Sequence, residues 1–141
     1  MTDAITEIYE EQQRAACDIT FTLPMPSSKI NPNSRHHFHV QAKIKKECRA
    51  LAYAVARKAT TWRNDVPFPL ARVERIFFFR DKRDRDGDNF AAACKSYLDG
   101  IVDAGLIVDD CFRCLPELIA TYGGVDRKNP RVVFCFWKLK T

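Results

Sequence analysis

The sequence has no run of about 18 apolar residues, the length that a membrane-spanning helix requires. Its first eleven residues, MTDAITEIYEE, lack the basic start and the apolar stretch of a secretory signal. These absences predict a chain that contacts no membrane and stays in the cytoplasm. The sequence also has no internal repeat, no low-complexity segment and no glycine-rich phosphate loop.

A second CxxC pair is missing as well, which argues against structural zinc. Cys111 and Cys114 form the one CxxC, and a four-ligand zinc site would need two copies of the chain. We interpret this pair as two reduced cysteines in a turn. Cys48, Cys94 and Cys135 fall in apolar helix or strand patterns, which is typical of small buried side chains in a reducing compartment.

The 141 residues, 46% of them hydrophobic, are enough for one domain with a real core. The net charge of +5 favours an anionic partner, and nucleic acid before a membrane surface. Residues 1–16 are acidic and polar, so we expect an N-terminal arm that is disordered or a short helix. Residues 17–141 are expected to form the single domain.

Hydrophobic periodicity predicts an α+β fold in the order β-α-β-α-β-β, with a mixed four-stranded sheet and two main helices. The predicted strands and helices cover residues 17–23, 40–62, 70–79, 89–104, 115–122 and 131–139. The strand ending at Phe79 is apolar on both faces, which suits a central strand or one covered by a partner chain. Glycines and a proline punctuate residues 123–130, so the last two strands are predicted to form a hairpin.

The helix at 40–62 is predicted to bury one apolar face and to expose a basic one. The apolar positions are Val40, Ile44, Cys48, Leu51, Val55, Ala59 and Trp62. The basic face could follow a phosphate backbone or could simply be solvated. Arg35 adds positive charge in the proline-rich loop before this helix.

The stretch 80–110 contains the residues that suggest chemistry. Asp86 and Asp88 would point to the same side of an extended segment, where two carboxylates could share a hard cation such as Mg²⁺. Asp88 or Asn89 is a candidate N-cap for the helix that follows, and Gly105 a candidate stop. A third carboxylate would complete the metal site.

Asp110 is the best candidate for that third ligand, and Asp109 is the second. A helix from 89 to 104 would carry the chain about 24 Å away, and five extended residues return at most about 17 Å. The segment therefore doubles back so that side-chain reach closes the gap, or the helix is shorter than predicted, or Asp110 serves a neighbouring subunit. Lys95 could assist a charged transition state or contact DNA, or it could simply pair with Asp99, four residues on.

The pattern Asp86-Gly87-Asp88-Asn89, Lys95, Asp99 and Asp109-Asp110 resembles the RusA family of Holliday junction resolvases, particularly phage and prophage members. The entry Leu23-Pro24-Met25-Pro26-Ser27 and the order of elements are also similar, so the resemblance covers about residues 17–139. The interval between Asp88 and Lys95 is three residues longer than in the best-known member of that family.

This resemblance implies a homodimeric endonuclease that depends on Mg²⁺, with Mn²⁺ as a substitute, and that resolves four-way DNA junctions by paired nicks during recombination and repair. Asp86, Asp88 and Asp110 would ligate the metal, and Lys95 would assist catalysis or bind DNA; no organic cofactor is implied. Asp109 and Asp99 are second-rank candidates among the acidic residues of the site. The basic residues that we expect to contact DNA are Arg35, Lys43, Lys46, Lys82, Arg83 and Arg85.

Two other classes fit parts of the pattern. A non-catalytic junction- or DNA-binding protein on the same scaffold would keep the basic surface without metal chemistry. Another metal-dependent phosphohydrolase, such as a nucleotide hydrolase, would use the acids on a small substrate. A glycosyltransferase with a DxD motif is disfavoured, because the chain leaves little room for a nucleotide-sugar domain.

Overall fold

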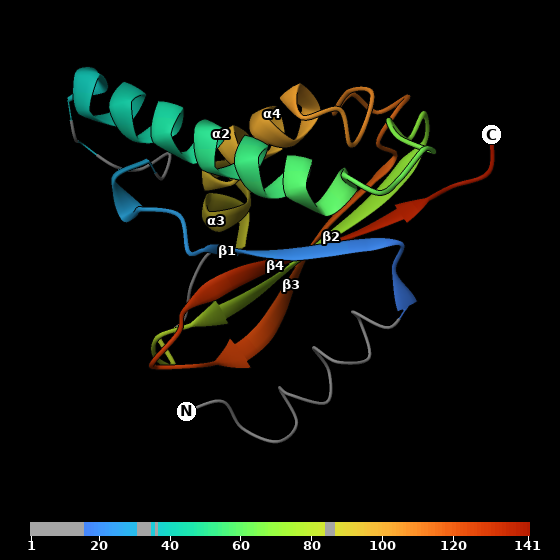
Figure 1. Cartoon of the computed structure of the whole chain (residues 1–141). Helices are drawn as coiled ribbons and strands as arrows, with labels where there is room; N and C mark the ends of the chain where they lie inside the picture. The colour runs from blue at the N-terminus through green and yellow to red at the C-terminus, as the bar shows by residue number, and fades with distance from the viewer. Residues whose placement is uncertain (1–15, 31–34, 36, 84–86) are drawn as a thin grey trace.

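The computed structural model describes residues 16–30, 35, 37–83 and 87–141, with the backbone alone for residues 87–89. Residues 1–15 of the predicted N-terminal arm therefore lie outside the described residues. The elements, in chain order, are β1 (Ile19–Pro24), η1 (Ser28–Ile30), α2 (Phe38–Thr60), β2 (Ala71–Phe79), α3 (Gly87–Ala93), α4 (Lys95–Asp103), β3 (Glu117–Val125) and β4 (Arg131–Lys138). The predicted order is confirmed, with the second helix divided into α3 and α4 (Figure 1).

The four strands form one mixed sheet in the order β1-β4-β2-β3. Strand β2 pairs in parallel with β3, whereas the β1–β4 and β2–β4 pairs are antiparallel. The predicted class, α+β with a mixed four-stranded sheet, is confirmed. The predicted hairpin of the last two strands is wrong, because β4 inserts between β1 and β2 and leaves β3 at the edge.

The apolar content of each strand explains its place in the sheet. Residues 132–136 of β4 are all buried, and so is almost all of β2, which suits central strands that are covered on both faces. Strand β3 contains Gly123 and Gly124 and several exposed residues. At the edge of the sheet it buries less polar surface than it would in a central position.

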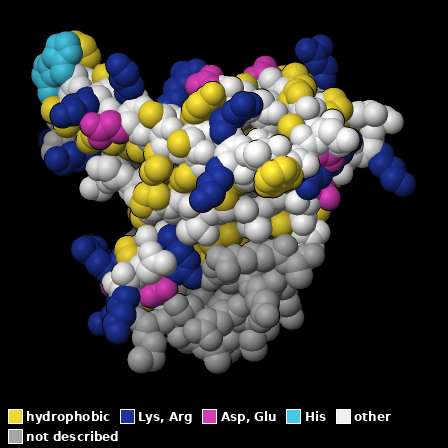
Figure 2. All heavy atoms as spheres, in the orientation of Figure 1, with side chains coloured by type: hydrophobic (Ala, Val, Ile, Leu, Met, Phe, Trp, Pro, Cys, Tyr) yellow, Lys and Arg dark blue, Asp and Glu magenta, His cyan; other side chains and the backbone are white. Residues whose placement is uncertain are grey.

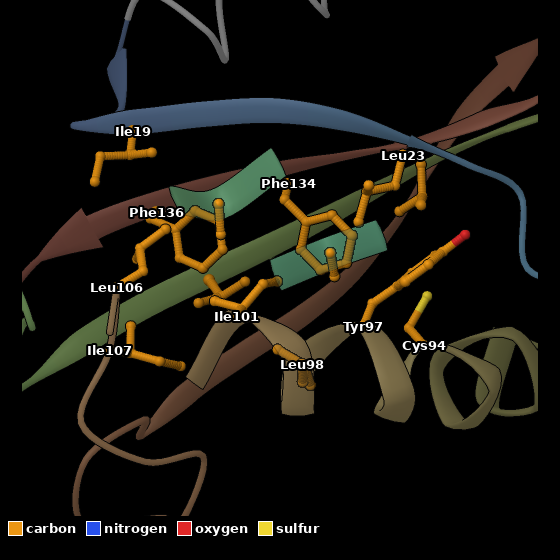
Figure 3. Packing of buried hydrophobic residues seen from close by; sticks show 14 of the residues in the cluster. Ile19, Leu23, Cys94, Tyr97, Leu98, Ile101, Leu106, Ile107, Phe134 and Phe136 are labelled. Carbon is orange, nitrogen blue, oxygen red and sulfur yellow. The ribbon is translucent and has the colours of Figure 1, made fainter. Parts of the chain in front are cut away.

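Helices α2, α3 and α4 lie on one side of the sheet (Figure 1). Beneath them the main core is built from α4 side chains and aromatic rings of β4, which point toward one another in Figure 3. Tyr97 is buried and donates a hydrogen bond of 2.8 Å from its hydroxyl to the carbonyl of Pro24. Each buried aromatic side chain of this kind contributes about 1.5–3 kcal/mol. A smaller cluster on the opposite face contains Ile76, Phe78, Val133 and Cys135.

Helix α2 packs against α4 through small residues, which corrects the predicted buried face. Ala52, Ala56 and Thr60 are its buried residues, and Cys48, Val55 and Ala59 are only partly buried. Val40 and Leu51 are exposed, and Trp62 lies beyond the end of the helix with 96% of its surface exposed. The reason is close packing: Gly100 of α4 approaches the backbone of α2, so the contact runs along its alanines rather than along its large residues.

All six cysteines are free, and Cys94 and Cys135 are buried as predicted. Burial raises the pKa of the Cys94 thiol to about 12, so it stays protonated and packs as an apolar side chain. None of the helices within the described residues combines the length and apolar character needed to cross a bilayer.

Candidate functional site

Helices α3 and α4 follow one another almost without a break. At Cys94, where φ is −78° and ψ is −2°, the backbone N–H bonds to the carbonyls of both Phe90 and Ala91 at 3.2 Å. Leu98 then donates to the Cys94 carbonyl at 3.1 Å, which continues the helical pattern. Residue 88 therefore precedes residue 95 by about 10 Å along the helical path.

The helix begins earlier than expected, at Gly87. Asp88 is thus inside the first turn of α3 and is not its N-cap, and the extended geometry assumed for Asp86 and Asp88 does not hold at Asp88. The helix starts before both candidate caps, so Asn89 is not its N-cap either. Asp86 and Arg85, and the side chain of Asp88, lie outside what the structure describes.

Lys95, at the start of α4, binds two carboxylates at once. Its Nζ lies 2.6 Å from Oδ1 of Asp99 and 2.5 Å from Oδ2 of Asp110. Asp99 is one turn along the same helix, whereas Asp110 arrives from the loop after α4. The pairing of Lys95 with Asp99 is confirmed, and the lysine also contacts Asp110, a predicted metal ligand. A role of Lys95 in catalysis or DNA binding stays a prediction.

The charges in this cluster stabilise one another. Partial burial lowers the pKa of Lys95, but the hydrogen bonds and negative charges of Asp110 and Asp99 outweigh it, and the net pKa is raised. The hydrogen bond from Lys95, together with its positive charge, holds the pKa of Asp110 below the ordinary value. The ion pair between Lys95 and Asp110 therefore favours the charged form of both groups.

The loop after α4 brings Asp110 back within the same chain. Gly105 has φ of +80° and ends the helix as predicted, and Ile107 then forms a parallel bridge with Phe68. The backbone N–H of Asp110 is bound by the carboxylate of Asp109 at 2.8 Å. The loop folds back far enough for Asp110 to reach Lys95, fifteen residues earlier in the chain.

A metal site made of Asp86, Asp88 and Asp110 stays a prediction. The part of the chain that the structure describes holds no group of three histidine, cysteine or acidic side chains suited to a metal. Asp99 and Asp110 already surround a positive charge with carboxylate oxygens, the ligand type that Mg²⁺ prefers. Asp109 is exposed beside them.

The predicted DNA-contacting residues that are described, namely Arg35, Lys43, Lys46, Lys82 and Arg83, are all exposed. Arg83 also pairs with Asp81 at 3.2 Å. Sequence reasoning missed a wider basic group. Because β2 and β3 are parallel, their carboxyl ends meet, and Asp126 donates a 2.7 Å backbone hydrogen bond to Phe79 there. The exposed cations around these ends are Arg80, Lys82, Arg83, Arg127 and Lys128.

Arg75 is a second residue that sequence reasoning missed. Only 4% of its surface is exposed, and its Nη1 donates a 3.2 Å hydrogen bond to the carbonyl of Ala91, just before the bend between α3 and α4. Burial lowers the pKa of its guanidinium. The available signal was an arginine directly before the apolar run Ile76 to Phe79 of this strand. Arg75 therefore ties the centre of the sheet to the helices that carry the acidic residues.

No family model matches this chain. An uncharacterized protein of Xylella fastidiosa (strain Temecula1 / ATCC 700964) is 37% identical over 92 residues, which are 64% of this chain and 60% of that protein. The chain thus spans less than two thirds of this relative. The crystal structure of the periplasmic domain of Helicobacter pylori MotB matches at a TM-score of 0.40 and 16% identity, covering 87% of this chain and 84% of that one. A similarity this low supports no conclusion about the chain.

Proposed function

We propose that this protein is a Mg²⁺-dependent, structure-selective endodeoxyribonuclease that resolves four-way DNA junctions by paired nicks, as the resemblance to the RusA family implies. Mn²⁺ is the expected substitute. The substrate is DNA at a recombination or repair junction, and the compartment is the cytoplasm.

The observation that carries this proposal is the contact between Lys95 and Asp110. The two residues are fifteen positions apart, and both belong to the pattern that resembles the family. Sequence spacing left it open whether Asp110 could return to the helix predicted at 89–104. Their contact makes a common site within one chain geometrically sensible.

The side chains of the site have distinct tasks in this proposal. Asp86, Asp88 and Asp110 would hold Mg²⁺, which would activate water and stabilise charge on the attacked phosphate. Lys95 keeps Asp110 ionised before the ion arrives, which its lowered pKa supports. The Lys95 ammonium would also assist catalysis or contact a DNA phosphate. Asp99 keeps that ammonium in place through its own hydrogen bond.

A homodimer completes the proposal. Two copies related by a two-fold axis would present two identical sites to the two-fold symmetric junction, which is the arrangement that paired nicks require. Sedimentation of the protein alone and with a junction should give the mass of two chains. A monomer that nonetheless makes paired nicks would contradict this part.

The decisive experiment is cleavage of a synthetic four-way junction with Mg²⁺ or Mn²⁺, comparing wild type with Asp88→Asn and Asp110→Asn. Both variants should bind the junction and lose detectable nicking. Lys95→Ala should be slower by about 10- to 100-fold, as for residues that support a metal ligand. Asp103→Asn is the matched control, because this exposed acid of the same helix pairs with Arg49 instead.

The outcome also separates the alternative functions. Wild-type protein that binds the junction but never nicks it would indicate a non-catalytic DNA-binding protein. Turnover of free nucleotides without junction cleavage would indicate another phosphohydrolase.

A further inference from the structure

On strand β3, apolar side chains are exposed to solvent on the face of the sheet that packs against the helices. Its residues Leu118 and Tyr122 pair with Val73 and Phe77 of β2, which belong to the core beneath the helices. Yet Leu118 is 38% exposed and Tyr122 is 65% exposed. β3 is the edge strand of the sheet, and both side chains are open to solvent there.

The Tyr122 ring is nevertheless held in a fixed orientation. It stacks on Phe79 with the ring centres 5.8 Å apart and the planes 21° apart. Phe79 in turn meets Phe90 of α3 edge-on, at 5.1 Å and 74°. Phe79 is buried and Phe90 follows Asp88 by two residues. The three rings therefore form a column from the first turn of α3 to the exposed ring.

A β-bulge lies directly after Tyr122. Phe77 pairs with Tyr122 and Phe78 pairs with Gly124, so Gly123 is the extra residue. A Cβ at Gly123 would lie 2.6 Å from Cγ2 of Ile76 and 2.8 Å from the Phe78 ring, so only glycine fits. Bulges of this kind turn the neighbouring side chains and are common beside active sites. The bulge and its required glycine thus lie next to Tyr122 in the edge strand.

The surroundings of the ring are basic. The carboxyl ends of β2 and β3 lie next to one another, and the exposed cations there are Arg80, Lys82, Arg83, Arg127 and Lys128. Figure 2 shows Lys and Arg side chains gathered at the lower left, where these two strands end in Figure 1. An exposed, pre-oriented aromatic ring among cations is the combination that binds single-stranded nucleic acid, by stacking and by phosphate attraction.

We infer that Tyr122 is a nucleobase-stacking subsite: its ring stacks on an unstacked base at the crossover of the junction and positions that strand beside α3. The inference rests on the proposed function, and it assigns Tyr122 a positioning role, not a chemical one. Because every base has an aromatic face, the subsite tolerates any sequence and selects for bases that are free of their helical stack.

The test is a cycle that removes the ring and the base separately. Junction binding is measured without divalent metal for wild type, Tyr122→Ala and Tyr122→Phe, on an intact junction and on junctions with one abasic nucleotide at each position flanking the crossover. On the intact junction, Tyr122→Ala should bind about 5- to 100-fold more weakly, and Tyr122→Phe should bind like wild type. At one position the abasic site should weaken wild type by a similar factor and leave Tyr122→Ala unchanged.

Trp62→Ala is the matched control, because Trp62 is an exposed aromatic residue just beyond α2 to which no DNA contact is assigned. It should bind as wild type does. The inference is overturned if each abasic site affects wild type and Tyr122→Ala equally, or if wild type binds no junction.

Cleavage with Mg²⁺ tests the proposed function separately. If the abasic site weakens binding only when Tyr122 is present, but the wild type makes no nicks, the proposed nuclease activity is contradicted and the stacking subsite is supported. A wild type that nicks normally without this dependence on Tyr122 would contradict the subsite alone.

Discussion

Replacing Gly100 with alanine tests how closely the helix that carries Lys95 and Asp99 packs on α2. A Cβ at this position would overlap the backbone carbonyl oxygen of Arg49 and lie 3.0 Å from the Cβ of Ala52. The first contact involves backbone, so no side-chain rotation can relieve it. Helices α2 and α4 must move apart, and the well-packed alanines between them must lose contact.

The sign of the effect is what makes the test informative. Helix propensity alone predicts that Gly100→Ala stabilises the fold by about 1 kcal/mol. Forcing an extra carbon into a tight contact costs about 1–3 kcal/mol, and a rigid backbone neighbour places the cost near the upper end. The expected net result is a loss of about 2 kcal/mol.

Urea unfolding measures this loss. With a denaturant dependence of about 2 kcal/mol per molar, the midpoint should fall by about 1 M while the dependence itself stays constant. Ala50→Gly, at an exposed position of α2, calibrates the propensity and should cost about 1 kcal/mol. A midpoint for Gly100→Ala that is unchanged or raised would refute the close packing of the two helices. Junction nicking, if present, should fall as well, since α4 shifts relative to Asp110.

Two further predictions concern charged groups. Arg131 and Asp126 form a buried pair at 2.7 Å, each with 8% of its side chain exposed, so Asp126→Asn should destabilise the fold by about 3 kcal/mol in urea titrations; a change below about 0.5 kcal/mol would contradict this. The pKa of Asp110 is lowered in the folded protein, so its contact with Lys95 stabilises above the unfolded value of about 3.9 and fades as the pH falls through the folded value. Asp110→Asn should therefore lower the free energy of unfolding at pH 7 by less than about 1 kcal/mol, which a lower melting temperature would report. Near pH 2 the variant and the wild type should melt at the same temperature. A difference that is constant from pH 7 to pH 2 would show that the ion pair is not its source.

Local patterns in the sequence were sufficient for the type of most elements. Strict alternation over 17–23 and a continuous apolar run up to Phe79 predicted strands that the structure has at Ile19–Pro24 and Ala71–Phe79. Period-3.6 patterns predicted both helical regions, with ends within two residues except for the bend at Cys94. These successes share a cause, because a single element's hydrophobic period depends only on its own residues.

The partners of the elements were harder to foresee. The glycines and proline between β3 and β4 suggested a hairpin, but β4 pairs with β1 and β2 instead. The continuous apolar run of β4 is best buried in the sheet centre, and this gain outweighs the short path to β3. In α2, the large apolar residues looked like the buried face, yet a glycine on α4 selected the alanine face.

By itself, the sequence determined the fold class, the order of the elements and the acidic pattern that suggests a nuclease, because these follow from residue types at short spacing. Only the tertiary structure decided that Asp110 meets Lys95, that the ends of β2 and β3 gather positive charge, and that Tyr122 stays open beside them. Such contacts join residues that are distant in the chain, and their geometry depends on how the helices and strands pack together.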